Sequence, residues 1–121
     1  MSSQTAQLDR VFQALSDPTR RAVVDRLSRG PAPVGELAAP FAMALPSFLQ
    51  HLSVLEDCGL VSSKKVGRRR ICSGSAAPLA AAEGWMAQRR LVWERRLDRL
   101  DAFLEETKPG RAARQEKEKK R

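Results

Sequence analysis

The sequence predicts a mainly helical domain that carries one small β-hairpin. Apolar residues recur at helical spacing along most of the chain. Gly and Pro residues divide that pattern into short segments, and a β-prone stretch at 61–73 is centred on Gly67. With 121 residues, 42% of them apolar and 30% charged, the chain is long enough for one domain with its own core.

Two helices are expected in the N-terminal quarter of the chain. The first covers residues 8–15, where the side chains at i, i+3, i+4 and i+7 are Leu8, Val11, Phe12 and Leu15. The second begins after Asp17, a good N-cap residue, with Pro18 at the first helical position. It runs to about Arg29, where a Gly-Pro pair ends it. We expect it to bury Val23, Val24 and Leu27.

Two further helices are predicted to form a helix-turn-helix. A short helix starts near Val34 and ends at Pro40, a turn follows over 41–44, and a longer helix covers 45–58. The longer helix has Ala44 at its N-cap position, so no side chain there accepts a hydrogen bond. Its apolar stripe predicts that the side chains facing the core are Phe48, Leu52 and Leu55.

The predicted hairpin is strongly basic. Its strands are expected at Val61–Lys65 and Arg69–Ser73, and no acidic residue lies between positions 64 and 70. The whole chain has a formal net charge of +8. A helix that fits the major groove, followed at once by a basic hairpin, predicts binding to double-stranded DNA. The candidate phosphate or minor-groove contacts of the hairpin are Lys64, Lys65, Arg68, Arg69 and Arg70.

The other face of the 45–58 helix supplies the candidate base readers, which are Ser47, Gln50, His51 and Ser53. Gln50 is the best candidate for a direct base contact, because its amide can pair with adenine N6 and N7. His51 has two interpretations: it donates to a phosphate, or it packs between helix and hairpin and satisfies a backbone carbonyl.

A last helix is expected from Pro78 to about Glu106. Trp93, Leu97, Leu100 and Leu104 step by four, three and four residues, which is the seam spacing of a coiled coil. We expect a second copy of the chain to cover this seam, and the alternative is that it packs back on the first three helices. The expected dimer interface joins those four residues to Leu8 and Phe12 of the first helix. The domain would end at residue 107, followed by a basic, disordered tail at 108–121.

Other classes of function are disfavoured by residue inventory. Cys58 and Cys72 lack metal-ligand spacing, and with a single His they predict no metal or other cofactor. Both are expected to be apolar fillers, with a thiol switch as the alternative. No nucleophile–base pairing or glycine-rich phosphate loop of recognised spacing points to an enzyme. No apolar run spans a bilayer and the N-terminus lacks a secretory signal, so a cytoplasmic protein is expected.

The series of motifs resembles the ArsR/SmtB family of bacterial repressors, which have a winged helix-turn-helix fold. The likeness covers about residues 8–107, and it rests on LSDPTR at 15–20, ELA at 36–38, HL at 51–52, LE at 55–56, GLV at 59–61 and GR at 67–68. The resemblance implies α-α-α-α-β-β-α topology and dimerisation through the terminal helices. Metal-responsive members carry cysteines in the helix before the turn or ligands in the last helix, and this chain has neither pattern.

Together these observations predict a homodimeric, sequence-specific repressor that binds an inverted-repeat operator. The alternatives are a basic nucleic-acid-binding protein of low sequence specificity, a thiol-responsive repressor, and an adaptor that keeps the fold without binding DNA. A neighbouring winged-helix family is the alternative at the level of fold. The sequence identifies no effector.

Overall fold

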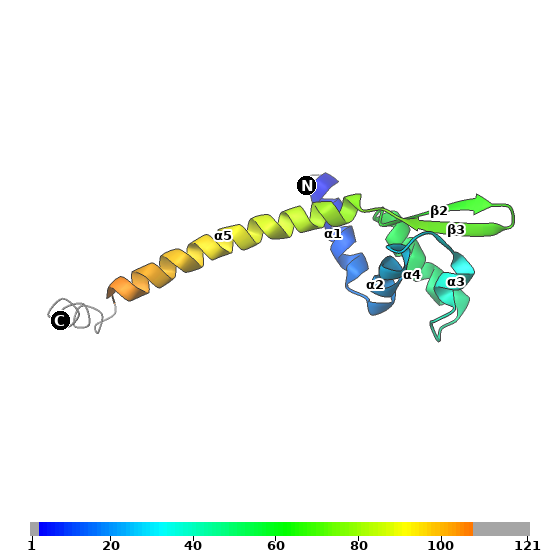
Figure 1. The fold of residues 1–121 in the computed structure, drawn as a ribbon, viewed down its shortest axis with the longest axis horizontal. Coiled ribbons are helices and arrows are strands. Elements are labelled where there is room, and N and C mark those ends of the chain that lie inside the picture. Colours follow the sequence, from blue (N-terminus) through cyan, green and yellow to red (C-terminus); the bar gives the residue numbers. More distant parts are fainter. Residues whose placement is uncertain (1–2, 108–121) are drawn as a thin grey trace. The chain divides into compact units, whose positions relative to one another are not determined.

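The structure is a computed structural model that describes residues 3–107. The predicted disordered tail at 108–121 therefore lies outside the described residues. The chain divides into two units, one up to Gly84 and one from Trp85 onward, and each is described by itself. The first unit holds four helices, a three-stranded sheet and the start of the last helix (Figure 1).

The predicted helices are confirmed, with shifts at their ends. They are α1 (Ser3–Leu15), α2 (Pro18–Leu27), α3 (Val34–Ala38) and α4 (Leu45–Asp57). Helix α1 begins five residues before the predicted start, in a polar stretch that shows no apolar periodicity. Gln7 anchors that stretch, because its Nε2 donates a 2.6 Å hydrogen bond to the Cys58 carbonyl at the end of α4.

Asp17 caps α2 as predicted. Its Oδ2 accepts the backbone N–H of Arg20 at 3.0 Å, and Pro18 occupies the first helical position. This hydrogen bond from the backbone is the main cause that lowers the pKa of Asp17 below its ordinary value of 3.8. The charge that His51 carries when protonated and the charge of Arg20 also lower it, while burial opposes them. The ionised carboxylate therefore strengthens the cap.

The core lies between the helices and the base of the sheet. The residues predicted to face inward from α4 are all buried, at 0–1% exposure. Val24, expected to be buried, is only partly so. Cys58 and Cys72 are both completely buried, as expected of apolar fillers. The buried cluster comprises Val11, Ala14, Val23, Leu27, Ala32, Leu37, Phe48, Leu52, Leu55, Cys58, Leu60, Val61, Cys72 and Ala82.

The sheet has one strand more than the sequence predicted. Strands β2 (Val61–Val66) and β3 (Arg69–Gly74) form the expected hairpin, and β1 (Ala32–Pro33) pairs antiparallel with the other side of β3. The order along the sheet is β1-β3-β2. The sequence did not predict β1, because two residues are too few to show an alternating apolar pattern. Its Pro33 is tolerated because β1 is an edge strand. The observed topology is thus α-α-β-α-α-β-β-α.

A glycine in the left-handed region joins α4 to the hairpin. Gly59 has φ +83°, its N–H donates to the Glu56 carbonyl at 3.0 Å, and the next N–H, of Leu60, donates to the Leu55 carbonyl at 3.1 Å. These two bonds form a Schellman motif that ends the helix. Gly67, with φ +65°, makes the turn between β2 and β3. We call this hairpin the wing.

Helix α5 (Ala77–Thr107) begins in the first unit and makes up the described part of the second. Its predicted bounds, Pro78 to about Glu106, are confirmed to within a residue. Along 85–107, large apolar side chains are exposed in the single chain. Among the described helices, none has the length and apolarity that crossing a membrane requires.

We expect Asp17→Ala to lower the free energy of unfolding by about 1 kcal/mol, because the first turn of α2 loses its side-chain acceptor. Asp17→Asn keeps an acceptor and should lose much less at neutral pH. Since the pKa of Asp17 is lowered on folding, its charge stabilises the fold above the ordinary value of 3.8, and this contribution is lost as pH falls through the lower folded value. Denaturant titrations of the three proteins at neutral and acidic pH measure both effects. Equal stability of the Ala and Asn variants would contradict the capping role.

Candidate nucleic-acid interface

Helix α4 presents a polar face to solvent. Ser47, Gln50 and Ser53 are exposed, opposite the buried apolar stripe, as the sequence predicted. Leu49 packs against the core, whereas Leu45 stays 54% exposed beside the polar residues. No side chain caps the N-terminus of the helix, in agreement with Ala44 at that position.

His51 lies differently from the other candidate readers. Its side chain is half-buried and its Nδ1 lies 3.2 Å from the Arg20 guanidinium and 3.7 Å from Asp17 Oδ2, so it contacts α2 and its cap. This differs from the second interpretation of the sequence, in which His51 packs against the wing and bonds a backbone carbonyl. Arg20 is itself fixed, because it donates to the carbonyls of Ala14 at 2.8 Å and Gln13 at 2.9 Å.

The contact with Arg20 determines which ring nitrogen of His51 carries the proton. A guanidinium has only donors, so Nδ1 must accept its hydrogen bond and the proton of the neutral ring lies on Nε2. The neutral imidazole thus keeps an N–H donor on the ring nitrogen that Arg20 does not contact.

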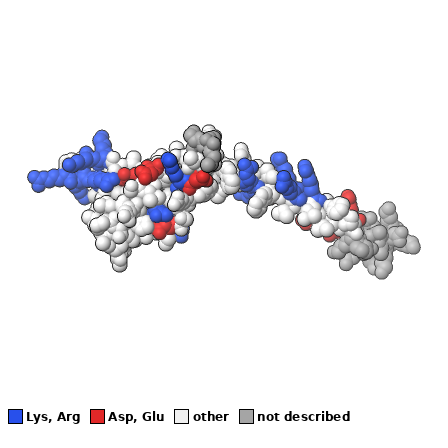
Figure 2. Space-filling view, turned by 180° about the vertical axis from the view of Figure 1, so that it is seen from behind, with Lys and Arg blue, Asp and Glu red and all other residues white. Residues whose placement is uncertain are grey.

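The basic residues of the wing occupy both of its faces. Directly paired residues share a face, so Lys65 and Arg70 lie on the side of buried Cys72. Lys64 and Arg69 lie on the other side, and Arg68 follows Gly67 in the turn. All of these basic side chains are exposed. Figure 2 shows Lys and Arg gathered over the wing on the face that it presents.

One wing residue is tied to α4. Arg70 forms an ion pair through its Nη2 with Glu56 Oε1, and its Nε donates to Ser63 Oγ at 3.0 Å. Ser63 in turn donates to Glu56 Oε1 at 3.2 Å. We call these three residues the Glu56 triad. It links α4, β2 and β3 on the face of the wing that is turned toward the core.

Neither cysteine has the surroundings of a reactive thiol. Cys58 Sγ donates to the Leu55 carbonyl at 3.3 Å, and burial raises the pKa of the Cys72 thiol above its ordinary value. Both are free thiols. Within residues 3–107, no group of three or more His, Cys, Asp or Glu side chains could hold a metal ion.

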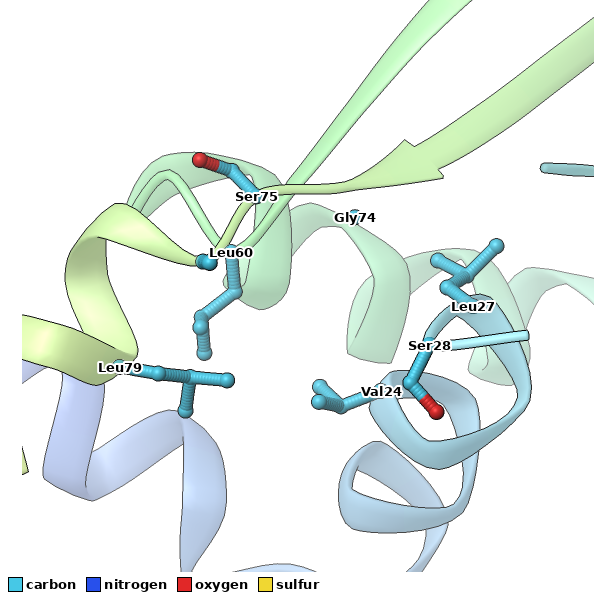
Figure 3. A pocket seen from close by; sticks show the side chains of 8 residues that line it. Val24, Leu27, Ser28, Leu60, Gly74, Ser75 and Leu79 are labelled. Carbon is cyan, nitrogen blue, oxygen red and sulfur yellow. The ribbon is translucent and has the colours of Figure 1, made fainter. Parts of the chain in front are cut away.

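A hollow of about 310 Å³ lies where α5 leaves the base of the wing (Figure 3). Val24 points into it from α2, Leu79 from α5, and Leu60 from the segment that joins α4 to β2. None of its described lining residues is charged, so the hollow offers no cation to a phosphate.

The residues predicted to form a dimer interface divide between the two units. In the first unit, Leu8 and Phe12 of α1 are partly buried and pack against the core. In the second unit, the seam residues of α5 are between 49% and 68% exposed: Trp93, Leu97, Leu100 and Leu104. Isolated apolar side chains are common on surfaces, but a row at coiled-coil spacing is not.

Sequence reasoning missed the partners of two predicted site residues. Arg20 lies in a recognised motif, but nothing in its local spacing points to His51, which is 31 residues away. Glu56 and Arg70 are 14 residues apart on different elements. The available signal was Glu56 itself, one of two acids in the last turn of the helix that precedes the basic hairpin.

Comparisons with known proteins agree with this geometry. A family model described as a helix-turn-helix domain matches residues 15–63. The HTH-type transcriptional regulator Rv2034 of Mycobacterium tuberculosis (strain ATCC 25618 / H37Rv) is 47% identical over 73 residues, or 60% of this chain and 68% of that protein. The transcriptional repressor SdpR of Bacillus subtilis (strain 168) is 33% identical over 79 residues, covering 65% and 88%. The crystal structure of the ArsR family transcriptional regulator RHA00566 matches with a TM-score of 0.73 and 53% identity, covering 78% of this chain and 97% of that chain.

The matched segment 15–63 runs from the end of α1 into β2 and contains the whole of α4. The similarity to RHA00566 covers nearly the whole of that regulator. The fold, the reading helix and these relatives thus agree with the family resemblance found in the motifs. The chain belongs to the ArsR/SmtB family of winged helix-turn-helix proteins, which are DNA-binding transcriptional regulators and not enzymes.

Proposed function

We propose that this regulator is a homodimeric repressor that binds an inverted-repeat operator, with α4 in the major groove and the wing on the sugar-phosphate backbone. The observation that carries this proposal is the exposed polar face of α4 in the same unit as a basic wing. An α-helix fills the major groove, and cations beside it neutralise phosphates.

The roles of the α4 residues follow from their positions. Gln50 is exposed in the middle of the polar face, where its amide can make two hydrogen bonds to adenine. Ser47 lies in the first turn, where helix N-termini favour phosphate. Ser53 reads a base edge farther along the groove, and His51 donates to a phosphate through Nε2.

The wing positions the protein on the duplex but contributes little to the recognition of base sequence. Lys64, Lys65, Arg68 and Arg69 contact phosphates or the adjacent minor groove. This distribution favours a sequence-specific protein over a general nucleic-acid binder, because five of the eight exposed Lys and Arg side chains of the first unit lie together on the wing and do not cover the surface evenly.

A dimer is supported by the exposed seam of α5. A second copy related by a twofold axis would cover Trp93, Leu97, Leu100 and Leu104. Leu8 and Phe12 of α1, which pack against the core of the first unit, are proposed as further contacts to the same partner. Two α4 helices about one duplex turn apart require an inverted repeat. Repression is supported by the relative from Bacillus subtilis, which is a transcriptional repressor.

Thiol-responsive repression is the less favoured candidate. Both thiols are completely buried, and burial raises the pKa of Cys72, which disfavours the thiolate that oxidation requires.

The test of the proposed function is selection of genomic fragments by the purified protein. We expect the recovered fragments to share an inverted repeat with half-sites about one duplex turn apart. Recovery of fragments with no shared sequence, together with equal affinity for scrambled duplexes, would support a low-specificity binder instead.

Removing two wing cations should reduce the salt dependence of DNA binding. Arg68→Ala with Arg69→Ala removes two phosphate contacts, so the slope of log K against log salt should become shallower by about two. Fluorescence anisotropy with a labelled duplex over a salt series measures this slope. Arg95→Ala with Arg99→Ala removes the same charge from α5 and should leave the slope unchanged. An unaltered slope in the wing variant would mean that the wing does not touch DNA.

Charges placed in the seam of α5 should separate the dimer. We expect Leu97→Glu with Leu100→Glu to halve the mass measured by sedimentation and to weaken operator binding at least tenfold, because an isolated copy contacts one half-site. Gln88→Glu with Ala102→Glu adds the same charges on the opposite side of the helix and should leave the dimer intact. A dimer that survives in the seam variant would exclude these residues from the interface.

A further inference from the structure

We propose that Glu56 is a positioning residue that withholds Arg70 from DNA phosphates and fixes the wing to α4, thereby limiting non-specific binding. This inference rests on the proposed function, since it assigns a role within the same DNA-binding surface. It changes the role expected of Arg70, which the sequence places among the phosphate contacts.

The geometry sets Arg70 apart from the other wing cations. Its Nη2 donates to Glu56 Oε1 and its Nε donates to Ser63 Oγ. Ser63 also donates to Glu56 Oε1, so each of the three side chains is hydrogen-bonded to the other two. Within residues 3–107, Lys64, Lys65, Arg68 and Arg69 form no ion pair, so they keep their donors for phosphate.

The triad also resolves a repulsion within the wing. Lys65 and Arg70 are directly paired across β2 and β3 and share a face. Like charges in that position destabilise a strand pair. Glu56 supplies the compensating negative charge from α4, and its side chain is only 26% exposed, so water screens the pair less than it would a fully exposed one.

Two consequences for DNA binding follow. A phosphate that approached Arg70 would have to displace Glu56, whose own charge repels it, so Arg70 adds little to the salt-dependent part of the affinity. The Glu56 triad also holds the wing in one orientation relative to the polar face of α4. Phosphate contacts and base contacts then form together only in the register that suits both, which increases the ratio of operator binding to non-specific binding.

Glu56→Gln tests this inference, because it keeps an oxygen that can accept hydrogen bonds but removes the charge that holds Arg70. On a scrambled-sequence duplex, we expect the salt slope to steepen by about one, since Arg70 can now neutralise a phosphate. Non-specific affinity should rise several-fold at low salt. Asp57→Asn, the matched control, removes the same charge from the next residue of α4 and should not change the slope.

Arg70→Gln and the double variant complete the cycle. Arg70→Gln alone should leave the slope close to that of the unaltered protein, whereas Arg69→Gln should make it shallower by about one. Adding Arg70→Gln to Glu56→Gln should return the slope to its original value, which loss of fold stability alone would not do. Thermal melts of each variant check that it is folded.

Two results would overturn the inference. One is a slope in Glu56→Gln equal to that of Asp57→Asn. The other is a slope reduced as much by Arg70→Gln as by Arg69→Gln, because Arg70 would then already contact phosphate. Failure of the proposed function looks different: Arg69→Gln would leave the slope unaltered and no duplex sequence would be preferred, and that result would remove the basis of this inference as well.

Discussion

The burial of one face of α4 is the constraint on which the rest of the molecule depends. Phe48, Leu52 and Leu55 are completely enclosed by neighbouring helices and the base of the sheet. Because a helix repeats every 3.6 residues, fixing those three side chains in the core leaves Ser47, Gln50 and Ser53 no position except in solvent. The same packing that makes the domain stable therefore also creates the polar face that we propose reads DNA.

Patterns that repeat locally were predictable from the sequence, and contacts between distant elements were not. The apolar stripe of α4, the Asp17 cap and the turn at Gly67 each leave a signature within a few residues, and the structure confirms them. Strand β1 is too short to leave one. The start of α1 depends on Gln7 bonding to the end of α4, which no periodicity reports. The candidate site shows the same division, because exposure of the readers was predictable while the partners of His51 and Arg70 were not.

The charged side chains are arranged differently in the two units. In the first unit, exposed cations gather on the wing and one of them is neutralised by an acid from α4. In the second unit, Arg90 pairs with Glu94 one turn along the helix, an interaction that is weak in water and adds little to stability. Along 85–107 the five Arg residues are balanced by five Asp or Glu residues, whereas positions 64–70 of the wing hold five basic residues and no acid.

The Schellman motif at Gly59 has a consequence for the kind of DNA that the protein accepts. Only three residues separate the last turn of α4 from β2, and two backbone hydrogen bonds hold them. The Glu56 triad links the elements on either side of them. In the proposed complex, the distance from reading helix to wing is preset. A duplex must then offer a groove width and local curvature that match it, so stiff or easily bent base steps that no side chain touches will still contribute to sequence preference.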